Sequence, residues 1–176
     1  MTRILVAACV CTCLVTAAAQ DVPLEYRVKA AYLYNFTRFV EWPASAFDAS
    51  DSFTICLAEV NPFGPSLAAT LAGETAAGRP LVARVVDDAA TGCHVLFVPA
   101  SVSAAPHLRR VRGEPVLTVG ESRDFLELGG IIRFVQQNGK IRFEISQDNA
   151  ARSQLTISSR LLKLAAVRAG AQGGGK

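Results

Sequence analysis

The chain has 176 residues, of which 51% are hydrophobic and 19% are charged. This composition is too apolar for a disordered protein, and the length suits one domain of common size rather than two. The formal net charge is only +3 and the arginines are dispersed, so the sequence lacks the concentrated basic face that a nucleic-acid partner requires.

The N-terminal segment has the three parts of a secretory signal peptide. Arg3 supplies a positive charge, residues 4–15 form an apolar stretch, and residues 17–19 are three alanines at which cleavage is expected. A membrane span needs about twenty apolar residues, so this run of about a dozen is too short for an anchor. We therefore predict a signal peptide over residues 1–19, cleaved near Ala19, and an exported mature protein.

Cysteine use agrees with export. Cys9, Cys11 and Cys13 leave with the signal peptide, so their close spacing is not a metal motif. Cys56 and Cys93 remain, and in an oxidising compartment they suggest one disulfide that closes a loop of about 37 residues. The alternative is a pair of buried, unpaired thiols, because free cysteine is among the most buried residue types.

An aromatic-rich segment near the start of the mature chain predicts an amphipathic helix that ends before Pro43. Glu25 and Lys29 form an i,i+4 pair outside its apolar stripe. Asn35 projects into the stripe, where an unpaired amide costs about 1–3 kcal/mol. We interpret it as a polar clamp, with a polar pocket as the alternative. The stripe residues are Leu24, Val28, Ala31, Tyr32, Phe36 and Phe39.

The middle of the chain alternates between apolar runs and helical segments. We expect buried strands because the runs are too continuous for half-exposed strands, which alternate apolar and polar residues. This βαβ rhythm predicts a mostly parallel sheet flanked by helices. The expected strands are residues 53–57, 81–86, 94–98 and 116–119, and the expected helices are residues 66–71 and 104–111.

The C-terminal part changes to an antiparallel hairpin. Residues 131–137 and 140–146 flank Asn138-Gly139, the pair that a type I′ turn prefers. In that register Arg133 lies opposite Glu144 on one face. The other face is apolar and consists of Ile132, Phe134, Ile141, Phe143 and Ile145.

A closing helix completes the predicted fold. Asp148 or Ser146 can cap it, and its apolar residues are Leu155, Leu161, Leu162 and Leu164. We therefore expect an α/β fold: a mostly parallel sheet flanked by helices, with a C-terminal antiparallel hairpin and a closing helix. Residues 20–168 form a single domain in this prediction, and residues 169–176 form a disordered tail by composition.

The residues that could perform chemistry do not form a recognisable catalytic group. Cys93 and His94 are adjacent on a strand, so their side chains point to opposite faces, and His107 lies in a helix. We expect no catalytic residue, no metal site and no cofactor, because metal-ligand spacings and a glycine-rich phosphate loop are missing. Five arginines could assist an anionic ligand at the carboxyl ends of the strands: Arg79, Arg84, Arg123, Arg133 and Arg142.

Six segments in order span nearly the whole mature chain. They are AAYLYNFTRFVEWP (30–43), FTICLAEVNPFG (53–64), GCHVLFVPAS (92–101), PVLTVGESRDFLELGGIIRF (115–134), KIRFEIS (140–146) and LTISSRLLKLA (155–165). Together these segments resemble the YfiR family of exported bacterial proteins.

The resemblance implies a small periplasmic α/β protein that inhibits an inner-membrane diguanylate cyclase by binding the cyclase's periplasmic sensor domain, which lowers cyclic di-GMP. It also implies that an outer-membrane, peptidoglycan-associated lipoprotein sequesters the regulator, and that the regulator forms a homodimer. Cys56 and Cys93 match the family's strand cysteines, whereas a second pair found in some members is absent. The alternative function is a periplasmic small-ligand-binding or sensory module for another membrane receptor.

A regulator that acts by contact needs an apolar docking surface, and aromatic side chains dominate the energetics of such surfaces. Tyr26, Leu33 and Val40 form a second apolar strip on the first helix, away from its main stripe. We expect this strip to be the candidate partner-binding surface. The alternative is that the helix is buried on two sides.

Overall fold

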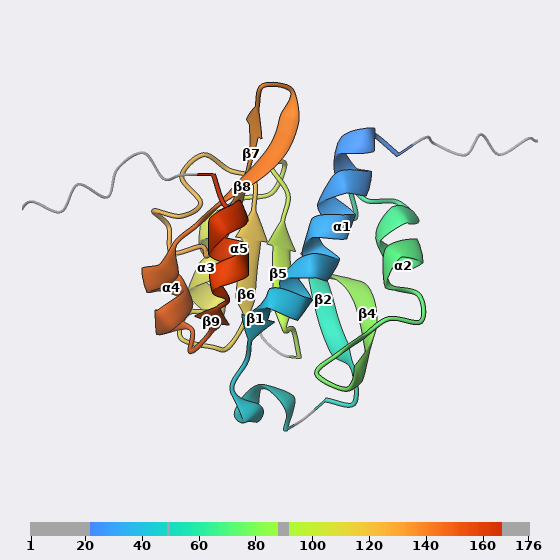
Figure 1. Ribbon diagram of the computed structural model, residues 1–176, viewed down its shortest axis with the longest axis vertical. Coiled ribbons are helices and arrows are strands. Elements are labelled where there is room, and N and C mark those ends of the chain that lie inside the picture. The colour runs from blue at the N-terminus through green and yellow to red at the C-terminus, as the bar shows by residue number, and fades with distance from the viewer. Residues whose placement is uncertain (1–21, 49, 88–91, 167–176) are drawn as a thin grey trace, which may run out of the picture.

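A computed structural model describes residues 22–48, 50–87 and 92–166. Its centre is a seven-stranded sheet with the order β3-β4-β2-β5-β6-β7-β8, in which β3 and β8 pair antiparallel with their neighbours and the other strands are parallel (Figure 1). The mostly parallel α/β fold with a C-terminal hairpin is therefore confirmed. The strands are β2 (Phe53–Ala58), β3 (Thr75–Ala76), β4 (Arg79–Val86), β5 (Val95–Val98), β6 (Leu117–Gly120), β7 (Ile132–Gln137) and β8 (Lys140–Ile145).

Helices cover both faces of the sheet, because successive residues of its buried strands point to opposite sides. Helices α1 (Leu24–Phe39), α2 (Ser66–Leu71) and α5 (Ser159–Leu164) contribute to one hydrophobic cluster, and α3 (Ala104–Arg110) contributes to the other. In Figure 1, α1 and α5 lie in front of the sheet and α3 lies behind it. In β2, for example, Ile55 and Leu57 face the α1 side, whereas Cys56 and Ala58 face the α3 side.

The C-terminal hairpin has the predicted register. Asn138 and Gly139 have φ angles of +51° and +70°, as a type I′ turn requires at both central positions. Arg133 pairs with Glu144 across the strands, and its Nη2 lies 2.6 Å from Glu144 Oε2. The alternation of faces read from the sequence is thus confirmed.

The end of the chain differs from the single closing helix that we expected. Helix α4 (Gln147–Arg152) is capped by Ser146 rather than Asp148, and it is followed by β9 (Thr156–Ile157) before α5 begins. Strand β9 pairs antiparallel with β1 (Val40–Glu41). This pairing also explains why α1 ends at Phe39, because the next two residues are extended in a strand before Pro43 is reached.

Strand β4 corrects a second expectation. We expected residues 81–86 to be continuously buried, but Val82 and Val85 are 40% and 47% exposed. The physical reason is its position near the edge of the sheet, where β3 pairs only with Arg79 and Pro80 at the start of β4. By contrast, β2 and β5 are buried along their whole length, as expected for central strands.

The predicted signal peptide (residues 1–19) and the predicted tail (residues 169–176) lie outside the described residues. Among the residues that the structure describes, the longest helices fall short of the length and apolar character that a bilayer crossing demands. A short 3-10 helix, η1 (Ala44–Phe47), follows β1 and is the remaining helical element of the described chain.

Candidate functional site

The two cysteines of the predicted mature chain form a disulfide. Cys56 on β2 is bonded to Cys93, two residues before β5, with the Cα atoms 5.7 Å apart. The disulfide prediction is confirmed, and the alternative of two free thiols is wrong. Both cysteines are buried on the α3 side of the sheet, so the bridge fastens two central parallel strands to each other.

The predicted partner-binding strip on α1 lies against the sheet instead of solvent. Leu33 and Val40 are 0% and 5% exposed and belong to the main core. Tyr26 is half-buried and packs edge-on against Phe63, with ring centroids 5.4 Å apart. The prediction that these residues form an outer strip is therefore wrong for Leu33 and Val40. The helix is rotated relative to the orientation that we expected, which buries Leu33, and Val40 lies beyond the helix in β1, where it pairs with Ile157.

The same rotation moves Asn35 to the outside of the helix. Its side chain is exposed, and Nδ2 donates a hydrogen bond to the carbonyl oxygen of Ala31 one turn earlier, at 2.9 Å. The polar-clamp prediction is wrong in its premise, because the amide is not buried in the aromatic stripe and water can solvate it.

Part of the stripe that we expected to bury against the sheet instead lines a surface groove, whereas Phe36 is fully buried as expected. Leu24 is 71% exposed and Val28, one turn further along α1, is 37% exposed. Together with Ala31 they form one wall of a groove of about 730 Å³, which we call the α1–α2 groove. Arg27 is the charged residue among the described side chains that line it. The opposite wall is formed by α2 through Ser66, Ala69 and Thr70.

A buried ion pair holds α1 in this orientation. Lys29 is only 4% exposed, and its Nζ donates to Glu121 Oε1 at 2.5 Å and also to the carboxylate of Glu25. Glu121 comes directly after β6 and also accepts from the backbone N–H of Ala100 at 2.8 Å. Attraction to the two carboxylates, of which that of Glu121 is buried, offsets the cost of removing the ammonium group from water, so Lys29 can occupy the sheet-facing side of the helix.

The hydroxyl of Tyr26 belongs to the same cluster. It lies 3.4 Å from Glu121 Oε2, and Lys29 Nζ lies 4.7 Å from the centre of its ring. Burial, followed by the negative charges of Glu121 and Glu25, raises the pKa of Tyr26 to about 12. Tyr26 therefore stays protonated and donates to the carboxylate at any physiological pH.

The sequence contained one signal for this cluster. Lys29 falls three residues after Tyr26 and four before Leu33, which is the helical spacing of a shared face. We assumed that Lys29 faces solvent, and we therefore placed the face that Lys29 shares with Tyr26 and Leu33 on the outside of the helix. The partner that stabilises it, Glu121, is 92 residues away, and no local pattern connects the two.

A comparison with family models identifies the chain. Residues 26–166 match the model described as DUF4154, YfiR/HmsC-like. The chain belongs to the YfiR/HmsC-like family. The resemblance read from the six segments is thus confirmed, and the family consists of periplasmic regulators. No curated protein matches the chain.

In this YfiR/HmsC-like protein, His94 has a structural role. Its Nδ1 accepts a hydrogen bond from the backbone N–H of Thr54 at 3.0 Å, so the ring proton resides on Nε2, which donates to Ala46 O at 3.1 Å. The ring stacks on Phe47 and Phe53. Burial lowers its pKa; the hydrogen bond to Ala46 opposes this effect, and the charge of Arg79 reinforces it.

His107 lies where ligands bind in many open α/β sheets. The direction of the strand connections reverses between β2 and β5, and ligands usually occupy the crevice at the carboxyl ends of such strands. Here His107 of α3 is buried and its Nε2 contacts Oε1 of Glu59, which follows β2, at 3.0 Å. The contact between His107 and Glu59 therefore lies at this crevice.

The five arginines that we considered for an anionic ligand do not form one cluster, because they are spread over β4, β7, β8 and the segment after β6. Arg79 begins β4, at the amino end of the strands, and its Nε donates to Ser50 O at 2.9 Å. Arg123 follows the opposite, carboxyl end of β6. Arg133 is engaged with Glu144 and with the carbonyl of Arg123. Over residues 22–48, 50–87 and 92–166, no group of three His, Cys, Asp or Glu side chains is placed to hold a metal ion.

Proposed function

We propose that this protein is a periplasmic regulator that inhibits an inner-membrane diguanylate cyclase by binding the cyclase's periplasmic sensor domain, so that less cyclic di-GMP is made. Membership of the YfiR/HmsC-like family supports the regulatory role. The observation that carries the proposal is the α1–α2 groove, which leaves Leu24 and Val28 in contact with solvent. Exposed apolar side chains gathered beside a groove are characteristic of protein-binding surfaces.

The proposed occupant of the α1–α2 groove is an amphipathic helix of the sensor domain. A groove between two helices, with apolar residues at i and i+4 on one wall, accepts the apolar face of a third helix. Leu24 and Val28 have this spacing. Arg27 makes the rim positive, so we expect an acidic residue of the partner helix to lie beside it.

Two further partners belong to the same proposal. An outer-membrane, peptidoglycan-associated lipoprotein would relieve the inhibition by sequestering the regulator. A homodimer could use the same groove. In that case an aspartate introduced into the groove would convert the dimer into a monomer, which a measurement of the oligomeric state would detect. That result would reassign the groove from the cyclase to a second copy of the chain.

Deletion and complementation test the proposal. Deleting the gene should raise cyclic di-GMP, and the wild-type gene should restore it. A Val28→Asp variant should fail to restore it, because a charge on the groove wall must be desolvated on docking. Val82→Asp is the matched control, since Val82 has nearly the same exposure as Val28 and, being next to Leu81 in β4, points to the other side of the sheet.

Two results would overturn the proposal, provided that immunoblots show equal periplasmic levels of each variant. An unchanged level of cyclic di-GMP after deletion of the gene would show that the protein does not inhibit a diguanylate cyclase. Full restoration by Val28→Asp would show that the α1–α2 groove is not the contact surface. Restoration by Val82→Asp with failure of Val28→Asp is the expected pattern.

A further inference from the structure

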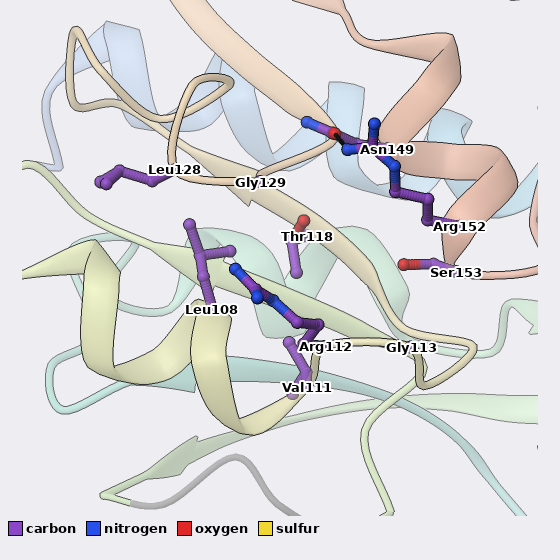
Figure 2. A pocket seen from close by; sticks show the side chains of 10 residues that line it. All are labelled: Leu108, Val111, Arg112, Gly113, Thr118, Leu128, Gly129, Asn149, Arg152 and Ser153. Atoms are coloured by element: carbon purple, nitrogen blue, oxygen red, sulfur yellow. Dashed lines mark hydrogen bonds between the residues drawn. The ribbon is translucent and has the colours of Figure 1, made fainter.

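A second hollow, on the α3 side of the sheet, has the chemistry of an anion site. It measures about 310 Å³, at the lower end of the range for ligand pockets, and lies between the end of α3, strand β6 and α4 (Figure 2). Two arginines, Arg112 and Arg152, enter it from opposite walls, and the described residues that line it include no aspartate or glutamate. The pocket is therefore positively charged.

One of the two guanidinium groups is held in place. Arg152 Nη1 donates to Asn149 Oδ1 at 3.1 Å. Asn149 is itself buried, and its Nδ2 donates to Leu126 O at 2.9 Å and to Gly130 O at 2.7 Å. With the amide fixed in this way, the guanidinium is oriented before any ligand arrives, which reduces the entropy cost of binding.

The other polar groups of the pocket offer donors. Arg112 makes no hydrogen bond or ion pair with the described part of the chain, so all its N–H groups are available. Thr118 is buried, and its Oγ1 accepts from the backbone N–H of Ile131 at 3.0 Å, which leaves its own proton for a ligand. Ser153 adds a second hydroxyl. Such a set of donors fits an oxyanion, which accepts hydrogen bonds and carries negative charge.

We propose that this pocket binds a small organic oxyanion, a carboxylate or phosphate ester that carries an apolar group, between Arg112 and Arg152. The apolar group is required by the remaining lining, to which Leu108, Val111 and Leu128 contribute. The ligand would join α3 to α4. Because the α1–α2 groove lies on the other side of the sheet, ligand and protein partner can bind together, and this inference stands independently of the proposed function.

Calorimetric titration of the chain from Gln20 to Lys176 at low salt provides the test, with inorganic phosphate, phenyl phosphate and phenylacetate as probes. Saturable binding of phenyl phosphate or phenylacetate is expected, and the tighter of the two identifies the head group. Inorganic phosphate should bind more weakly, because it leaves the apolar wall uncovered. Equal affinity for inorganic phosphate and phenyl phosphate would overturn the organic part of the proposal.

Three variants locate the binding. Arg112→Gln and Arg152→Gln should each weaken it about ten- to a hundredfold, as expected for lost hydrogen bonds to a charged group. Arg109→Gln is the matched control, because it removes the same charge three residues before Arg112, in the last turn of α3, from a residue that does not line the pocket. Arg112→Gln should leave the urea midpoint unchanged, since Arg112 has no polar partner to lose. Absence of saturable binding by every probe, or equal weakening by Arg109→Gln and Arg112→Gln, would refute the site.

Discussion

Replacing Lys29 with methionine tests how α1 is held against the sheet. The ammonium group is buried and lies 2.5 Å from Glu121 Oε1. In the Lys29→Met variant the Glu121 carboxylate stays buried, with the hydroxyl of Tyr26 at 3.4 Å and the backbone N–H of Ala100 at 2.8 Å as its remaining donors. Leaving one charge of a buried pair without its partner costs about 3–5 kcal/mol of unfolding free energy.

Two controls separate burial from simple charge loss. Glu25→Gln removes the other carboxylate that contacts Lys29, but Glu25 is nearly half exposed, so the expected cost is no more than about 0.5 kcal/mol. The double variant Lys29→Met/Glu121→Gln leaves no buried charge. It should therefore be more stable than Lys29→Met alone, which is a direct measure of coupling between the two sites.

Urea unfolding of the oxidised protein, followed by the fluorescence of its single tryptophan, Trp42, measures these differences. In a thermal scan Lys29→Met should lower the Tm by roughly 6–20 °C, at about 2–4 °C for each kcal/mol in a chain of this size. The reasoning fails if Lys29→Met costs no more than Glu25→Gln. It also fails if the double variant is less stable than Lys29→Met.

Three other predictions address the disulfide, the pH dependence and the packing of one glycine. Replacing both Cys56 and Cys93 with alanine should cost about 4 kcal/mol, the chain-entropy value for a separation of 37 residues, and an unchanged urea midpoint would contradict this. Because burial lowers the pKa of His94, the unfolded state takes up the proton at a higher pH than the folded state, so the free energy of unfolding should be highest above about pH 6.5 and should fall below it. Urea midpoints measured across this range should show the fall, and the His94→Asn variant should show a smaller one. Gly120→Ala places a Cβ atom 2.2 Å from the ring of Phe125 and should cost about 1–3 kcal/mol, so a Tm within a degree or so of wild type would refute the clash.

The central strands could be predicted from the sequence because each is a continuous apolar run bounded by turn residues. The disulfide could also be predicted, since Cys56 and Cys93 are the two cysteines outside the predicted signal peptide. The hairpin register followed from Asn138-Gly139, whose turn type fixes which residues face each other. In these cases a local pattern determines the structure.

The orientation of α1 could not be predicted, because it depends on a long-range partner. A helical wheel assigns Leu24 and Val28 to the buried face and Lys29 to the exposed face, as the usual burial preferences of these residue types suggest. In the structure each of these three assignments is reversed. Burial of Lys29 requires the carboxylate of Glu121, whose position at the end of β6 is set by the sheet. The groove was missed for the same reason, since its wall consists of residues assigned to the core.

The anion pocket was beyond sequence reasoning in a different way. Arg112 and Arg152 are 40 positions apart; Arg112 follows α3 and Arg152 ends α4, and only the folded sheet determines how these two helices lie relative to each other. Short strands such as β1 and β9 also could not be predicted from the sequence, because two extended residues are too few to show a periodic pattern.

The pairing of β1 with β9 has a consequence for secretion. Val40 and Ile157 are neighbours in the folded protein although 117 positions separate them along the chain. In a chain that crosses a membrane with its N-terminus first, β1 has no strand partner until residues 156 and 157 have followed it. The pairing therefore forms late, and contacts between such distant positions are also slow to form.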